Sequence, residues 1–205
     1  MQYQALWSNV ELNILNVGYR SVNCFLLVTD RAELLIDVGW PSGMPELKRS
    51  MALQGKSVKE VSHVLMTHYH IDHGGIAQEL KDKGAKLIVM ENQKDHLNDL
   101  KKYLRSPMVF HEIRSDGNID LRFDESRAFL EGIGIFGEII PTPSHGPDHV
   151  TLVLDEGIAF TGDLPPENAA EEGSEDYRDW KRLRSMRVKR IFPAHGNYDL
   201  ALENG

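Results

Sequence analysis

The first third of the chain alternates short apolar runs with short polar ones. Residues 10–17, 22–29 and 33–38 are rich in Val, Leu and Ile, and the polar segments 18–21 and 30–32 separate them. Runs of this length between turn-forming residues are typical of β-strands. The pattern therefore predicts an antiparallel meander at the start of the fold.

After the meander, the apolar positions alternate between helical and strand spacing. In chain order we predict a helix over 45–54, a strand over 61–67, a helix over 76–83, a strand over 85–90 and a helix over 91–104. Residues 105–118 contain Pro107 and the turn signal Asp116-Gly117-Asn118. We interpret them as a long surface connection that could act as a lid over a pocket.

The last third returns to short apolar runs. Residues 128–140, which contain glycines, and 150–155 are apolar segments, followed by a strand over 158–161, a helix over 177–186 and a strand over 188–193. Strands first, then strands alternating with helices, favour packed sheets with helices outside. No repeat or linker divides residues 1–205, so we predict a single domain.

Side chains suited to metal binding follow the predicted strand over 61–67. Four potential ligands fall within six positions: His68, His70, Asp72 and His73. Side chains alternate along an extended segment, so the first two histidines point the same way, and Gly74 and Gly75 permit the turn that brings the other two to the same pocket. Asp72 could instead be the N-cap of the next helix. Imidazole and carboxylate ligands without thiolate favour zinc, iron or manganese.

Three later segments are built alike, each with a candidate ligand after an apolar run and beside a glycine. They are Ser144-His145-Gly146, Gly162-Asp163 and Ala194-His195-Gly196. Strand ends on one rim are where side chains from distant parts of a sequence converge. Each segment alone is a weak signal, but together they predict one metal site.

Taken together, these segments resemble the metallo-β-lactamase superfamily, whose ligand order His-x-His-x-Asp-His, His, Asp, His is matched in full. The resemblance begins at Leu35-Ile36-Asp37-Val38-Gly39 and extends to Pro193-Ala194-His195-Gly196. It implies an α/β fold, the αββα sandwich, with two mixed sheets between outer helices. It further implies that His68, His70 and His145 bind a first metal ion, that Asp72, His73 and His195 bind a second, and that Asp163 bridges them.

Two further residues are candidates for supporting the ligands. By the resemblance Asp37 supports the ligand loop, with a plain turn residue as the alternative. His149 lies close to His145 in the sequence. It is either a hydrogen-bond partner of the ligand loops or a structural histidine, and the sequence leaves both open.

The ligand set predicts a hydrolase with two divalent ions, zinc first, with iron or manganese as alternatives. Hydroxide is available at neutral pH when metal ions lower the pKa of water from about 15.7 to about 7. We expect that hydroxide, bridging the ions and oriented by Asp72 and Asp163, to attack an ester, thioester or lactone carbonyl of a small-molecule substrate. Neither Tyr69 nor Tyr198 is a convincing proton donor for an amine leaving group.

Charge and composition narrow the partners. The formal net charge of -8 disfavours nucleic acid, and the basic run 181–190 looks like a solvated helix and its flanking loop. No apolar stretch has the length of a membrane span. Residues 1–16 do not resemble a signal peptide and Cys24 is the single cysteine, so we expect a cytoplasmic protein. The sequence does not indicate the oligomeric state.

Two other functions stay open at this point. The resemblance includes persulfide dioxygenases, which bind one iron through two histidines and an aspartate, here His68 or a neighbour, His145 and Asp163. The segment after Asp163 lacks the arginine-containing stretch of that group. A phosphodiesterase or nuclease is a weaker alternative, because only 31 residues separate Asp163 from His195 and leave no room for an inserted domain.

Overall fold

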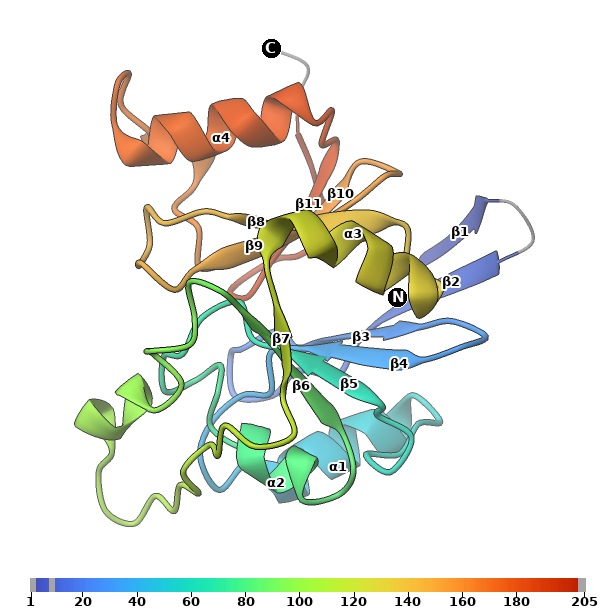
Figure 1. Cartoon of the computed structure of the whole chain (residues 1–205), viewed down its shortest axis with the longest axis vertical. Coiled ribbons are helices and arrows are strands. Elements are labelled where there is room, and N and C mark those ends of the chain that lie inside the picture. The colour runs from blue at the N-terminus through green and yellow to red at the C-terminus, as the bar shows by residue number, and fades with distance from the viewer. Residues whose placement is uncertain (1–2, 8–9, 203–205) are drawn as a thin grey trace.

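Two β-sheets stack face to face, and helices cover their outer faces (Figure 1). The structure is a computed structural model that describes residues 3–7 and 10–202. Part of the segment 1–16, tested above for a signal peptide, lies outside the described residues. Within the described residues, every helix is too short or too polar to span a bilayer.

The larger sheet has seven strands in chain order. They are β1 (Tyr3–Trp7), β2 (Val10–Asn16), β3 (Phe25–Val28), β4 (Glu33–Ile36), β5 (His63–Leu65), β6 (Lys86–Met90) and β7 (Ile119–Leu121). Neighbours from β1 to β4 are antiparallel, as the meander predicted, and those from β4 to β7 are parallel. The sheet is therefore mixed.

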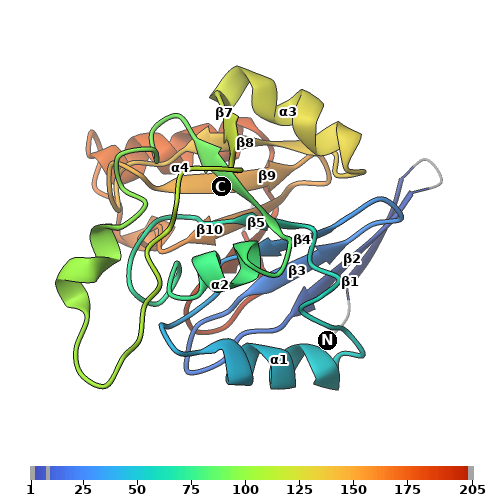
Figure 2. The ribbon, with the colours of Figure 1, turned by 60° about the horizontal axis from the view of Figure 1, so that its bottom comes forward.

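The smaller sheet has five strands in the order β12-β11-β10-β9-β8. They are β8 (Gly137–Pro141), β9 (Val150–Leu154), β10 (Ile158–Gly162), β11 (Arg190–Pro193) and β12 (Leu200–Ala201). Only the β10–β11 pair is parallel among these described strands. Figure 2 shows this sheet lying across the larger one.

The helices form the outer layers. They are α1 (Met44–Leu53), α2 (Ala77–Lys81), α3 (Phe123–Gly132) and α4 (Glu175–Ser185), with the short 3₁₀ helices η1 (Asp99–Tyr103) and η2 (Glu167–Ala169). Helices α1 and α2 lie against the larger sheet, and α3 and α4 lie on the side of the smaller one (Figure 1). The predicted αββα sandwich is confirmed.

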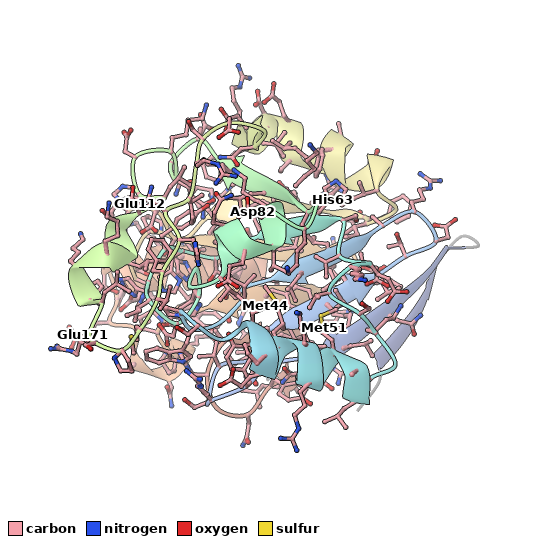
Figure 3. All side chains as sticks on the ribbon, turned by 90° about the horizontal axis from the view of Figure 1, so that it is seen from below. Met44, Met51, His63, Asp82, Glu112 and Glu171 are labelled. Atoms are coloured by element: carbon pink, nitrogen blue, oxygen red, sulfur yellow. The ribbon has the colours of Figure 1, made fainter. Side chains whose placement is uncertain are left out.

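Strand periodicity explains the layers. In β4, Leu34 and Ile36 face the opposite sheet, whereas Leu35 belongs to the core under α1 and α2. Met44 and Met51 of α1 belong to that outer core and lie on the helix as labelled in Figure 3. Burying a side chain of this size contributes roughly 1.5–3 kcal/mol, and a slip of one residue would expose the wrong face.

The predicted helix over 91–104 is wrong. The chain there forms turns followed by η1. Gln93 is fully buried, and its side-chain amide donates to the carbonyl oxygens of Met66 (2.9 Å) and Asp148 (3.1 Å). These tertiary hydrogen bonds hold the turn conformation in place of a regular helix, an outcome that local propensity does not encode.

The apolar segment 128–140 is two elements, which the sequence did not separate. Residues up to Gly132 end the unpredicted helix α3, and β8 begins at Gly137. Gly134, with φ +81°, lies in the turn between them, which only a residue without Cβ adopts readily. At the start of α3, the carboxylate of Glu125 accepts a hydrogen bond from the backbone N–H of Arg122 at 2.9 Å. The N-cap residue is Arg122 and not Ser, Thr or Asp, so the residue types that usually mark a helix start in a sequence are absent.

Candidate metal centre

The loop after β5 carries four of the seven predicted ligands. Backbone hydrogen bonds from His73 and Gly74 to the carbonyl oxygen of His70, at 3.2 and 3.1 Å, form a tight turn. Gly75 passes so close to Trp40 and Pro41 that a Cβ would lie 2.2 Å from their backbone atoms. The turn brings Asp72 and His73 towards the same point, and α2 starts later, with Ile76 as its N-cap. The alternative role of Asp72 as N-cap is therefore wrong.

The other three predicted ligands follow strands of the smaller sheet. Asp163 comes directly after β10, His195 lies two residues beyond β11, and His145 lies in the loop between β8 and β9. The two sheets are joined at this edge by a hydrogen bond from the backbone N–H of Val150 to the carbonyl oxygen of Thr67, at 2.8 Å. Loops from both sheets thus meet over the same edge.

The seven side chains converge into two groups. Within each group the candidate ligand atoms lie within 4.8 Å of one another, one group being His68, His70, His145 and Asp163, and the other Asp72, His73 and His195. Asp163 lies between the groups: Oδ2 is 3.8 Å from His68 Nε2 and 3.4 Å from His73 Nε2. Its other oxygen, Oδ1, is 3.2 Å from His195 Nε2.

Three atoms at the centre of the cluster have no hydrogen-bond partner within the described part of the chain, although they are buried. They are His68 Nε2, His73 Nε2 and Asp163 Oδ1. An unpaired buried polar atom costs about 1–3 kcal/mol, so three in one cluster suit atoms that bind a cation. Nitrogen and carboxylate oxygen suit a divalent cation, and the residues therefore fit the metal that the donor set implies.

Electrostatics support the same arrangement. Burial alone would raise the pKa of the Asp163 carboxyl, but the neighbouring His73, His195 and His145 outweigh it and lower the pKa to about 2. Burial would lower the pKa of His73, but the carboxylates of Asp37 and Asp163 outweigh it and raise the pKa to about 10. Burial lowers the pKa of His68 well below its usual value. The cluster therefore combines an anionic carboxylate with a neutral imidazole, the forms in which both bind metals.

Asp37 supports the loop that carries His68, His70, Asp72 and His73 through hydrogen bonds. It follows β4 in a left-handed conformation, and its carboxylate accepts from the backbone N–H of Thr67 (2.8 Å), the hydroxyl of Thr67 (2.8 Å) and His73 Nδ1 (2.9 Å). The Thr67 hydroxyl also lies 3.1 Å from His68 Nδ1. Because the carboxylate can only accept, His73 Nδ1 carries a proton. In the neutral ring that would bind a metal ion, Nε2 then presents its lone pair to the cluster.

His149 supports Asp163 through a hydrogen bond to its backbone, as Asp37 supports His73. It is fully buried, and burial lowers its pKa to about 3, so the ring is neutral. Its Nε2 accepts from the backbone N–H of Asp163 at 3.2 Å, and Nδ1 lies 2.8 Å from the hydroxyl of Thr142. Gly162 makes this approach possible, because a Cβ there would lie 2.7 Å from His149 Nε2.

Several residues that hold the ligands were missed in the sequence. The carbonyl oxygen of Ser21 accepts from His195 Nδ1 at 2.9 Å, and the side-chain amide of Asn23 donates to the carbonyl oxygens of Pro193 (2.9 Å) and Gly196 (3.2 Å). Asp148 accepts from the backbone N–H of Tyr69 at 2.7 Å. The only sequence signals were a polar Asn23 within an apolar run and an aspartate beside His149.

The tyrosines considered as proton donors lie in packed positions. Tyr69 is fully buried in the core under α1 and α2, and the ring of Tyr198 packs 5.7 Å from that of Phe25. A third tyrosine, Tyr103 of η1, has its ring centroid 6.0 Å from that of His70. Three histidines remain. His63 and His96 have partners of their own in Phe129, Ser62 and Asp99, and His111 lies in the predicted lid.

A pocket of about 450 Å³ opens beside the cluster. His145, Asp163 and His195 are part of its lining, together with apolar residues that include Leu164, Pro165, Trp180, Ile191 and Leu200. The predicted lid, residues 105–118, follows η1 in the segment that projects from the side of the sandwich (Figures 1 and 2). Its role as a lid stays a prediction.

The comparisons with known proteins agree with this geometry. Residues 17–195 match the family model for the metallo-beta-lactamase superfamily. The chain is 27% identical over 183 residues to a beta-lactamase-like protein 2 homolog of Drosophila melanogaster, covering 87% of this chain and 59% of the relative. It is 32% identical over 187 residues to an atrochrysone carboxyl ACP thioesterase of Aspergillus fumigatus, covering 86% and 38%. The chain thus spans about half the length of the curated relatives it matches.

Solved structures share the fold. A metallo-beta-lactamase family protein from Thermus thermophilus superimposes with a TM-score of 0.67 at 20% identity, covering 95% of this chain and 76% of that one. The FEZ-1 metallo-beta-lactamase of Legionella gormanii gives 0.64 at 21% identity, covering 92% and 77%. The fold of this family implies divalent metal binding. The chain belongs to the metallo-beta-lactamase superfamily.

Proposed function

We propose that this chain is a hydrolase that holds two divalent ions, zinc first, between the seven clustered side chains and cleaves a thioester of a small-molecule carrier. The observation that supports two ions is the pair of donor groups with Asp163 between them. Asp37 and His149 keep the ligands in place through their hydrogen bonds to His73 and Asp163.

Divalent ions bound in the cluster would supply Lewis acidity and make water a nucleophile near neutral pH. The chain's own part is to position the reactants. The carboxylates of Asp72 and Asp163 can accept a hydrogen bond from water on the open side of the cluster. The apolar side chains of Leu164 and Trp180 offer a surface against which an acyl group would pack. Hydrolysis adds the oxygen of water to the acyl carbon and breaks the bond to the leaving group.

A thioester fits this site better than an amide. A thiolate leaves without prior protonation, whereas an amine leaving group needs a proton donor. Tyr69 and Tyr198, the phenols considered for that role, are packed into the cores. Relatives named thioesterases, such as the one from Aspergillus fumigatus and the thioesterase pkgB of Emericella nidulans, support the same choice. Esters and lactones share the mechanism and rank second.

The test is a pair of substrates with the same acyl group, one a thioester and one an amide. We expect the protein purified without chelator to hydrolyse the thioester and to leave the amide intact. Dialysis against a chelator should abolish turnover, and Zn²⁺ or Mn²⁺ should restore it. Thioesterase activity that persists after elemental analysis shows the metal to be gone would contradict the proposal, as would a metal-loaded protein that cleaves no thioester.

A further inference from the structure

A second hollow, of about 760 Å³, lies along α4 next to the pocket at the metal centre. The two hollows share Trp180, and the chain runs from one to the other through consecutive residues, Pro166 in the first and Glu167 in the second. Trp180 is held in place by the hydrogen bond from its ring N–H to the carbonyl oxygen of Pro165, at 2.8 Å. The two hollows are therefore adjacent, and together we call them the α4 groove, whose inner part is lined by His145, Asp163 and His195.

The outer end of the α4 groove is positively charged. Lys181, Arg187 and Lys189 line it with exposed side chains, and none of the three has an ion-pair partner among the described residues. The one carboxylate in the lining, that of Glu167, is held by Arg184, with Arg184 Nε 2.8 Å from Oε1. An uncompensated cationic hollow is unexpected in a chain with a net charge of -8.

The basic run 181–190 was interpreted above as a solvated helix and its flanking loop, and the chain there is the end of α4 followed by a loop. Arg187 and Lys189 lie beyond the end of α4, in the connection to β11, so they are not on the helix that carries Lys181. Three cations from a helix and from the segment after it meet around one hollow. Tyr177, which is 37% exposed, adds an aromatic side chain to the same lining. Three cations around one hollow suit the phosphate group of a ligand.

We propose that the α4 groove binds the phosphate-bearing end of an acyl thioester, the part that coenzyme A and the phosphopantetheine arm of carrier proteins have in common. The inference rests on the proposed hydrolysis and names the substrate class for it. With the phosphate at Lys181 and Lys189, the pantetheine arm passes Trp180 and the thioester reaches the metal centre. The acyl chain then lies against the apolar lining near Leu164.

The contribution of the phosphate can be measured with three thioesters of the same acyl group. They are acyl-coenzyme A, acyl-4′-phosphopantetheine and acyl-pantetheine, which has no phosphate. We expect kcat/KM for the phosphate-bearing thioesters to exceed that for acyl-pantetheine by roughly tenfold or more, the effect of one or two charge-assisted hydrogen bonds. Preference for both phosphate-bearing thioesters over acyl-pantetheine supports the proposal. Preference for acyl-coenzyme A alone would assign the groove to the nucleotide and overturn the proposal.

The double variant Lys181→Ala/Lys189→Ala should reduce this ratio of kcat/KM values towards one. Its matched control is Lys48→Ala/Lys59→Ala, two exposed lysines without ion-pair partners in the described chain. Lys48 lies on α1, which covers the opposite outer face from α4 (Figure 1). The control should keep the wild-type ratio. All four lysines are exposed, so neither variant is expected to affect folding.

Binding of dethio-coenzyme A, measured by calorimetry, tests the groove without turnover, because this analogue has no sulfur to bind a metal. We expect binding to weaken roughly tenfold in the double variant and to stay unchanged in the control. Equal kcat/KM values for all three thioesters, or dethio-coenzyme A binding that the double variant does not alter, would overturn the proposal. A protein that binds the analogue but hydrolyses no thioester would instead overturn the hydrolase function.

Discussion

Replacing Asp163 with Asn should lower kcat for thioester hydrolysis by roughly 10²- to 10⁴-fold, the range associated with a group that handles a proton in the transition state. Asp163 lies between both donor groups, with His68, His73 and His195 nitrogens around its two oxygens. An amide is neutral and is a weaker metal ligand, so both the charge between the ions and the position of water change. Steady-state kinetics at saturating substrate measures the loss.

The fold should survive this change. The backbone N–H of Asp163 donates to His149, and that hydrogen bond does not depend on the carboxylate. Circular dichroism and thermal unfolding should therefore resemble those of the wild type after metal removal. Asp95→Asn, at an exposed aspartate in the turns before η1, is the matched control and should keep full turnover. A folded Asp163→Asn protein with normal kcat would contradict the proposal that Asp163 is a metal ligand required for turnover.

Replacing Asp37 with Asn should weaken metal binding by about 10- to 100-fold, the usual effect of losing a partner that orients a histidine ligand. The Asp37 carboxylate accepts from His73 Nδ1 and from Thr67 at the same time. An amide has one acceptor oxygen, so it cannot satisfy both sides. Competition with a chromophoric chelator gives the metal affinity directly.

Backbone strain does not account for the expected loss. Asp37 has φ +56°, and Asn tolerates this left-handed region as well as Asp does. Asp199→Asn is a control with the same feature, at φ +62°, whose carboxylate pairs with Arg190 and not with a ligand. It should keep the wild-type affinity. Equal metal affinity in the Asp37 variant and the wild type would show that His73 needs no such support.

The sequence predicted the layers well because they follow from strand periodicity. Leu34, Leu35 and Ile36 divide between two cores as alternation requires, and no long-range information is needed for that. The helix over 91–104 failed for the opposite reason. The conformation there depends on hydrogen bonds from Gln93 to Met66 and Asp148, which are distant in sequence. Such contacts leave no periodic signal.

The residues of the candidate site also divide into those that the sequence predicts and those that it does not. The seven proposed ligands could be predicted because each follows a strand and matches a family pattern in order. The groups that hold the ligands in place were harder to predict, since Ser21 acts through its backbone carbonyl, which every residue type has. Asn23 reaches the β11 end across 170 positions of sequence. Only the folded chain reveals such partners.

The number and identity of metal ions per chain decide between the two-metal hydrolase and its alternatives. Elemental analysis of protein purified without chelator should give close to two divalent ions, chiefly zinc, one for each donor group. His73→Ala, in the second group, should reduce that number towards one. A single iron per chain, unchanged by that substitution, would contradict the two-metal hydrolase and favour the persulfide dioxygenase alternative.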